Sequence, residues 1–164
     1  MVDKTHPKDA EIQLVVFQLS DEEYGAAIGQ VQEIVNLGKV TRMPKAPAFV
    51  EGIINLRGRV VPIIDIRKRF DLAPKERDKN ARIMVVLVEG QAMGIVVDSI
   101  SEVLRLPKED IEPPPQIIGD ISATYLKGVG KVGDRLVVLL DLDKVLTIEE
   151  VSELKKVISE ESGA

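Results

Sequence analysis

The residue types that most often do chemistry in proteins are scarce in this sequence. His6 is the only histidine among the 164 residues, and there is no cysteine. His6 stands directly before Pro7 in a polar N-terminal segment, where we expect a loose chain. Without a histidine base or a thiol, the usual arrangements for nucleophilic catalysis cannot be assembled. We therefore predict no catalytic residues, no enzyme activity and no cofactor.

One glycine-rich segment has a composition that could suit a phosphate. Residues 128–134 read GVGKVGD and include Lys131. Phosphate binding by such a loop depends on the N-terminus of a helix that follows the glycines. Here the segment leads into another apolar run, LVVLL. We interpret it as a tight hairpin rather than as a nucleotide site.

Two aspartates occupy matching places in the chain. Asp65 and Asp141 each end an apolar run and begin a segment of helical character, DIRKRF and DLDKVL. As a catalytic pair they would have to converge from distant segments, whereas an aspartate at a helix start commonly accepts a backbone N–H as a cap. We favour the cap. Because Asp71, Asp98 and Asp120 lack the spacing of metal ligands, no metal site is predicted.

Arg57 is the most unusual polar residue. In residues 52–62, GIINLRGRVVP, it stands beside Gly58 at the predicted turn between two strands. A guanidinium is a rigid fork of donors that suits a partner carboxylate or carbonyl groups. The alternative is an ordinary exposed hairpin arginine, or one that bonds to Glu33. The residues alone do not decide between these interpretations.

The elements that must position these residues are mostly short apolar runs. Valine and isoleucine dominate the runs, and only 3% of the residues are aromatic. Such β-branched residues favour strands. Near the C-terminus the apolar spacing becomes helical, and Thr147 with Glu150 forms a capping-box pattern. We expect strands at 12–19, 24–28, 49–56, 60–65, 83–88, 93–97, 126–132 and 136–140, a helical turn or bend at 31–35, and a C-terminal helix.

Two stretches of the first half recur in the second half. Glycines and charged residues match as well as apolar ones, which argues against chance similarity between strands. Arg57 aligns with Gly133, so the second copy lacks this arginine, and we regard it as a candidate for function rather than folding. The aligned segments are 13–35 with 82–104, at an offset of 69, and 49–70 with 125–146, at an offset of 76.

This repeat predicts a mainly β protein of two small antiparallel barrels with a groove between them. The two lobes should form one domain, and a terminal strand can cross between them. We expect a flexible tail at 1–11, a first lobe at 12–80, a second lobe at 81–147, and a short C-terminal helix and tail at 148–164.

Composition limits the possible partners. The formal net charge is -5, from 22 basic and 27 acidic residues. Nucleic-acid binding needs a basic face with stacking aromatics, so we expect none. No apolar run approaches the roughly 20 residues of a membrane span. The first 13 residues also lack a signal-peptide pattern, so we expect a cytoplasmic protein without direct membrane insertion.

Several segments resemble the CheW family of bacterial chemotaxis adaptors. They are residues 22–35 (EEYGAAIGQVQEIV), 52–70 (GIINLRGRVVPIIDIRKRF), 94–115 (GIVVDSISEVLRLPKEDIEPPP) and 125–146 (YLKGVGKVGDRLVVLLDLDKVL). The resemblance extends from about residue 11 to residue 146. It implies two five-stranded SH3-like barrels, and an adaptor that couples chemoreceptor tips to the regulatory domain of the histidine kinase CheA in receptor arrays.

The resemblance also implies binding residues. A receptor helix hairpin should dock in the groove between the lobes, and in the second lobe CheA should contact the region around the proline-rich segment. Some relatives carry a basic residue and an aromatic there, so Glu112 reverses the charge while Ile117 keeps the apolar character. The matching positions are Val31, Glu33, Arg57, Gly58 and Val103 for the receptor, and Glu112 and Ile117 for CheA.

A small-molecule-binding protein that uses the groove is the alternative. Ligand pockets commonly carry aromatic side chains. This chain has two tyrosines, three phenylalanines and no tryptophan. The alternative is therefore the weaker prediction.

Overall fold

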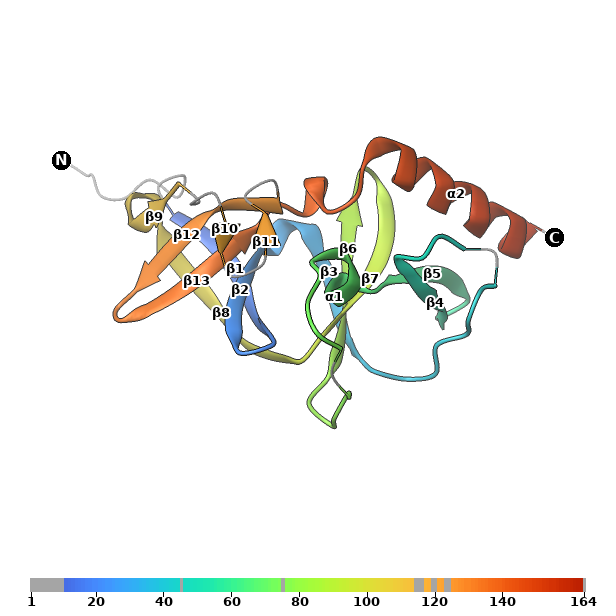
Figure 1. The fold of residues 1–164 in the computed structure, drawn as a ribbon, viewed down its shortest axis with the longest axis horizontal. Helices are drawn as coiled ribbons and strands as arrows, with labels where there is room; N and C mark the ends of the chain where they lie inside the picture. The colour runs from blue at the N-terminus through green and yellow to red at the C-terminus, as the bar shows by residue number, and fades with distance from the viewer. Residues whose placement is uncertain are drawn as a thin grey trace.

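The computed structural model describes residues 11–44, 46–74, 76–113, 117–118, 121–122 and 125–163. Two β lobes lie side by side, and the C-terminal helix lies over one of them (Figure 1). The predicted fold class, mainly β with two lobes and a C-terminal helix, is confirmed. The predicted tail lies outside the described residues except for Glu11, which begins the first strand.

Each lobe is built on one sheet, and we call the lobes barrel A and barrel B. Barrel A has the strand order β8-β1-β2-β13-β12-β9, and barrel B has the order β3-β6-β7-β5-β4. In barrel A, β1 is Glu11–Leu19, β2 Glu22–Ala27, β8 Ser99–Pro107, β9 Ile111–Glu112, β12 Leu126–Val132 and β13 Arg135–Leu140. In barrel B, β3 is Val31–Asn36, β4 Val50–Leu56, β5 Arg59–Ile64, β6 Arg82–Val88 and β7 Gln91–Val97.

Smaller elements connect and cover these sheets. The strands β10 and β11 form a separate ribbon, Ile117–Ile118 with Ile121–Ser122. One-turn 3-10 helices occur at Ile28–Gln30, Lys108–Asp110 and Leu142–Lys144. The helices are α1, Ile66–Arg69, and α2, Ile148–Gly163.

The structure corrects the predicted lobe boundaries, because the two copies exchange their first hairpins. The β1–β2 hairpin pairs with β8 and β13 from the second half of the chain, and the β6–β7 hairpin pairs with β3 and β5 from the first half. Neither 12–80 nor 81–147 is therefore a lobe. Barrel B takes its strands from residues 31–97, and barrel A takes its strands from residues 11–27 and 99–140.

A short connection explains the exchange. Asp98 is the only residue between β7 and β8. One residue is too short for a hairpin turn, which needs about two residues, or for a return crossover of about a dozen. The chain that leaves β7 must therefore continue into the other barrel, where β8 pairs with β1.

Three hydrophobic clusters stabilise this arrangement. Each barrel has a small interior cluster, which includes Ile63 and Val85 in barrel B and Val16 and Val137 in barrel A. The third cluster, which we call the shared core, takes side chains from both sheets and from α2. The C-terminal helix buries Leu154 in this core and lies against β5 of barrel B. The two barrels thus form one domain with a common interior.

The predicted local signals are mostly confirmed. The Asp65 carboxylate accepts the Lys68 N–H at 3.2 Å, and the Asp141 carboxylate accepts the Asp143 N–H at 3.2 Å. The Glu150 N–H donates to the Thr147 hydroxyl at 3.1 Å, while the Thr147 N–H donates to the Glu150 carboxylate at 2.8 Å. These contacts are two caps and a capping box. The glycine-rich segment 128–134 forms most of β12 and the turn into β13.

One local prediction is wrong. Residues 31–35 form β3 rather than a helical turn, and a 3-10 turn precedes the strand. Their apolar spacing is ambiguous over so few residues. Pairing with β6, which comes from the other copy, decides the conformation.

Candidate protein-interaction site

Arg57 and Glu33 form an ion pair at the rim of barrel B. The Arg57 guanidinium donates to the Glu33 carboxylate, which joins the β4–β5 turn to β3. The Arg57 side chain is 70% exposed, so the other guanidinium donors face solvent. The contact with Glu33, which was one form of the alternative to a partner-binding Arg57, is therefore present. This contact also leaves the other guanidinium donors of Arg57 available to a partner.

The turn that carries Arg57 has an uncommon backbone. Arg57 and Gly58 have φ angles of 51° and 85°, and the Gly58 N–H donates to the Asn55 side chain at 2.7 Å. A non-glycine residue in the left-handed region costs about 1–2 kcal/mol. The equivalent turn of the second copy has Gly133 in that conformation. Arg57 thus occupies a backbone conformation that glycine would adopt at a lower energy cost, which is consistent with a role for the arginine side chain.

Two exposed apolar side chains occupy equivalent positions on the two barrels. Val103 on β8 is 55% exposed, and Ile34 on β3 is 40% exposed. Val103 pairs with Val15 and Ile34 pairs with Met84, and both partners belong to the shared core. Directly paired residues point to the same face of a sheet. Val103 and Ile34 therefore lie on the sheet faces that form the contact between the barrels.

Of the other residues predicted to bind a receptor, Val31 is half-buried and packs against the shared core. Ile34 was not among the predicted residues. Its signal was already in the repeat, because Ile34 aligns with Val103 at the offset of 69. Because Val103 is a predicted receptor contact, the same prediction could have been made for Ile34.

A small hollow lies on barrel A beside the β2–β3 connection. It has a volume of about 280 Å³ and is lined by Glu11, Gln13, Ile28 and Arg105. Ile28 belongs to the 3-10 turn between β2 and β3, which connects barrel A to barrel B. Gln13 pairs with Arg105 two residues along from the Val15–Val103 pair, so the hollow and Val103 share a face. Because none of its named lining residues belongs to a strand of barrel B, the groove between the lobes stays a prediction.

The predicted kinase-binding residue Glu112 lies elsewhere, on β9 of barrel A. Its carboxylate pairs with Lys131 of β12 at 2.5 Å, and both side chains are more than half exposed. This hydrogen bond raises the pKa of Lys131 above its usual value. The reversed charge at Glu112 is therefore balanced within the chain. Sequence reasoning missed this, because Lys131 lies far from Glu112 in sequence. Ile117 is on β10, and its side chain is outside the described part of the structure.

A larger hollow adjoins Glu112. It has a volume of about 670 Å³, with Val129, Val138 and the 59% exposed Leu136 among its apolar lining residues. Arg135 at its edge donates to Glu23 at 2.9 Å and to Glu102 at 2.8 Å, which ties β13 to β2 and β8. Every residue named in its lining belongs to barrel A or its connections, not to the junction. The alternative prediction of a ligand groove between the lobes is therefore not supported by this hollow.

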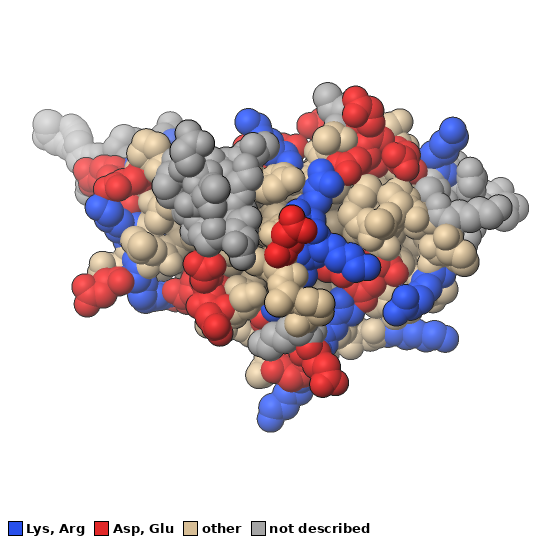
Figure 2. Space-filling view, in the orientation of Figure 1, with Lys and Arg blue, Asp and Glu red and all other residues tan. Residues whose placement is uncertain are grey.

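The charged surface is mixed. Acidic and basic side chains alternate over the face shown in Figure 2, with uncharged surface between them. Among the described residues, no group of three His, Cys, Asp or Glu side chains is arranged to hold a metal ion, and Asp120 lies outside this range. In the same part of the chain, no helix has the length and apolarity required to span a membrane.

Comparison with known proteins decides the family. The model of the CheW-like domain matches residues 13–150. The chain belongs to the CheW family. Chemotaxis protein CheW of Klebsiella aerogenes is 40% identical over 140 residues, which cover 85% of this chain and 84% of that protein. Chemotaxis protein CheW of Treponema pallidum is 39% identical over 150 residues, which cover 89% of this chain and 88% of that protein.

A solved CheW structure has the same fold. The crystal structure of the scaffolding protein TtCheW from Thermoanaerobacter tengcongensis superposes with a TM-score of 0.79 at 35% identity. The match covers 92% of this chain and 96% of that chain. The resemblance to the CheW family is confirmed, and with it a place among chemotaxis scaffold proteins.

Proposed function

We propose that this CheW-family chain is a non-catalytic cytoplasmic adaptor that couples chemoreceptor tips to the regulatory domain of CheA. It is recruited to receptor arrays at the membrane without inserting into it, and it needs no cofactor. Family membership supports the class of function. The observation that carries the proposal is the pair of exposed apolar side chains, Ile34 and Val103, on equivalent edge strands of the two barrels.

The proposed receptor face consists of the predicted residues together with Ile34. Apolar side chains of a receptor helix hairpin would cover Ile34 and Val103, because burying exposed apolar surface favours association. The free donors of Arg57 would bond to a receptor carboxylate or carbonyl group. The receptor face has an apolar part, Val31, Ile34 and Val103, and a polar part, Glu33, Arg57 and Gly58. The polar part lies around the edge of β3, because Glu33 pairs with Val85 of the interior cluster of barrel B and so points to the opposite side of the strand from Ile34.

The proposed kinase face lies on barrel A. It comprises Glu112 and Leu136, which line the hollow of about 670 Å³, together with Ile117, whose assignment rests on the resemblance to the CheW family. An apolar side chain of CheA would enter the hollow over Leu136. The Glu112–Lys131 pair at the rim would meet charges of both signs on the partner.

Matched charge insertions test both faces. We expect Val103→Arg to weaken binding to a receptor-tip peptide hairpin by at least about tenfold and to leave CheA binding unchanged. Leu136→Arg should do the reverse. Both side chains are exposed, so neither change should lower the melting temperature by more than about 4 °C. The measurement is calorimetric titration with each partner separately.

Two outcomes contradict the proposal. Absence of binding to both partners by the unaltered protein rules out the adaptor function. If one substitution weakens binding to both partners while the other weakens neither, the division into two faces is wrong.

Arg57 is tested against a neighbour on the same hairpin. Arg57→Ala removes the exposed donors and the Glu33 pair, and we expect about a tenfold loss of receptor affinity. Exposed ion pairs contribute about 0–1 kcal/mol, so the melting temperature should hardly change. Arg59→Ala is the control, because Arg59 contacts Gln32 at 3.4 Å and is also exposed. A large drop in melting temperature with unchanged affinity would assign Arg57 a purely structural role.

A further inference from the structure

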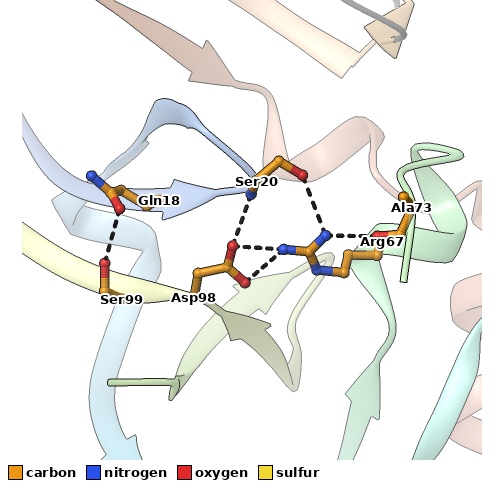
Figure 3. Close-up of polar contacts among 6 residues, drawn as sticks. All are labelled: Gln18, Ser20, Arg67, Ala73, Asp98 and Ser99. Atoms are coloured by element: carbon orange, nitrogen blue, oxygen red, sulfur yellow. Dashed lines mark hydrogen bonds and ion pairs between the residues drawn. The ribbon is translucent and has the colours of Figure 1, made fainter. Parts of the chain in front are cut away.

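A polar cluster joins the two barrels at one of their connections. Figure 3 shows Arg67 of α1 directed at Asp98, the residue between β7 and β8. One Arg67 nitrogen donates to both Asp98 carboxylate oxygens, at 2.7 and 2.6 Å. The other terminal nitrogen of Arg67 donates to the Ser20 hydroxyl at 3.3 Å and to the Ala73 carbonyl at 2.7 Å. The Ser20 N–H donates to Asp98 at 2.8 Å.

The members of this cluster come from separate structural units. Arg67 follows β5 of barrel B, Ser20 lies in the β1–β2 turn of barrel A, and Asp98 is the connection itself. The Arg67 and Asp98 side chains are only 15% and 16% exposed. A charge-assisted contact so largely removed from water holds its geometry more firmly than a surface ion pair does.

The internal repeat shows that the cluster is not a general requirement of the fold. At the repeat offsets, Ser20 aligns with Glu89, Arg67 with Asp143, and Asp98 with Gly29. Those three residues cannot form the same ion pair. The other connection, Ile28–Gln30, instead has Gln30 donating to Asp143 at 3.1 Å. The strong contact therefore exists at only one of two equivalent connections.

We propose that Arg67, Asp98 and Ser20 form a latch that sets the angle between the barrels and thereby positions the receptor face. β8 begins directly after Asp98, so the direction of this strand relative to barrel B is determined at the latch. Val103 lies five residues further on, about 17 Å along an extended strand. A rotation of about 10° at Asp98 would move Val103 by about 3 Å, enough to break a packed contact.

The latch is a positioning device, so its test includes a measurement that does not depend on binding. The chain has no cysteine, so the double variant Lys39→Cys, Glu109→Cys places one spin label near each barrel without background. Pulsed electron resonance then gives the distribution of distances between the barrels. We expect Arg67→Ala to broaden this distribution and to lower receptor-tip affinity about tenfold. Affinity for CheA, whose proposed contacts lie on barrel A, should remain unchanged.

Controls separate positioning from stability. Arg77 pairs with Glu51 of β4, and both residues belong to the barrel B part of the chain, so Arg77→Ala removes an ion pair within one barrel and should not broaden the distances. Arg67→Lys keeps the charge but loses the fork, and we expect an intermediate broadening. Should Arg67→Ala fail to fold, Asp98→Asn, which keeps the shape of the side chain, replaces it.

The possible outcomes are distinct. An unchanged distance distribution in a folded Arg67→Ala or Asp98→Asn variant overturns the latch. Broadened distances with unchanged receptor affinity keep the latch but overturn its role in positioning the receptor face, which rests on the proposed function. If the unaltered protein binds no receptor tip, the adaptor proposal fails, and the distance measurement still decides whether the latch exists.

Discussion

Tyr24 shows how strongly the interior acts on a single polar side chain. It is fully buried in the shared core, and its ring stacks on Phe17 with centroids 6.0 Å apart. Burial raises the pKa of its hydroxyl well above the usual value, and the nearby negative charge of Glu22 adds to this effect. Ionisation of Tyr24 is therefore disfavoured as long as the protein is folded.

This shift predicts how stability depends on alkaline pH. Because the folded state holds the Tyr24 proton more tightly than the unfolded state, the stabilisation is complete below about pH 10 and is lost as pH rises towards the raised pKa. In a Tyr125→Phe background, we expect tyrosinate absorbance to appear only as the chain unfolds. The same titration in denaturant is the control and should show the ordinary value. Ionisation of Tyr24 near pH 10 in the folded protein would contradict its burial.

At the scale of elements, one glycine in each barrel allows two backbone segments to approach each other closely. A Cβ atom at Gly52 of β4 would lie 2.3 Å from the Thr41 carbonyl oxygen, and one at Gly128 of β12 would lie 2.6 Å from the Glu112 carbonyl oxygen. Thr41 and Ile53 exchange two backbone hydrogen bonds of 2.8 Å, and β9 pairs with β12. The repeated glycines thus mark repeated close approaches between backbones.

Gly52→Ala should therefore destabilise the protein. We expect a loss of about 2 kcal/mol in the free energy of unfolding, because backbone must move to admit the methyl group. Gly38→Ala is the matched control, since no atom lies within 4 Å of its added Cβ. Urea denaturation measures both variants. Equal losses would show that the close approach at Gly52 does not matter.

Most of the long strands were predictable from the sequence, but β3, β8 and the two-residue strands β9, β10 and β11 were not predicted. Hairpins such as β4–β5 combine an apolar run, a turn residue and a second run, all within about 15 residues of sequence. β3 has no such local partner, because it pairs with β6, which begins at Arg82. Exposure of Ile34 and the contact of Glu112 with Lys131 are likewise products of pairing between distant segments.

At the scale of the whole molecule, the exchanged hairpins make each half of the chain incomplete. Residues 1–80 contain the β1–β2 hairpin but lack β8 and β13, the strands with which it pairs. Residues 81–164 contain the β6–β7 hairpin but lack its partners β3 and β5. The shared core also draws on both halves. Neither half can bury its apolar faces alone.

Division of the chain after residue 80 tests this architecture. We expect fragments 1–80 and 81–164 to lack cooperative thermal unfolding when separate, and to regain the native circular dichroism spectrum when mixed. The division falls between β5 and β6, outside every strand. Cooperative unfolding of either fragment by itself would show that a barrel forms without the exchange.

The sequence by itself determined most of the strands, their turns, the caps, the repeat and the family. These follow from side-chain period and turn chemistry, which act over a few residues, and from a pattern that can be compared along the chain. Only the tertiary structure decided which hairpin pairs with which copy, where α2 packs, and that Arg67 meets Asp98 between the barrels. The two copies are similar enough that either hairpin offers a suitable edge to either set of strands. The short connection at Asp98 and the burial of a shared core select one pairing, and both act between residues far apart in the sequence.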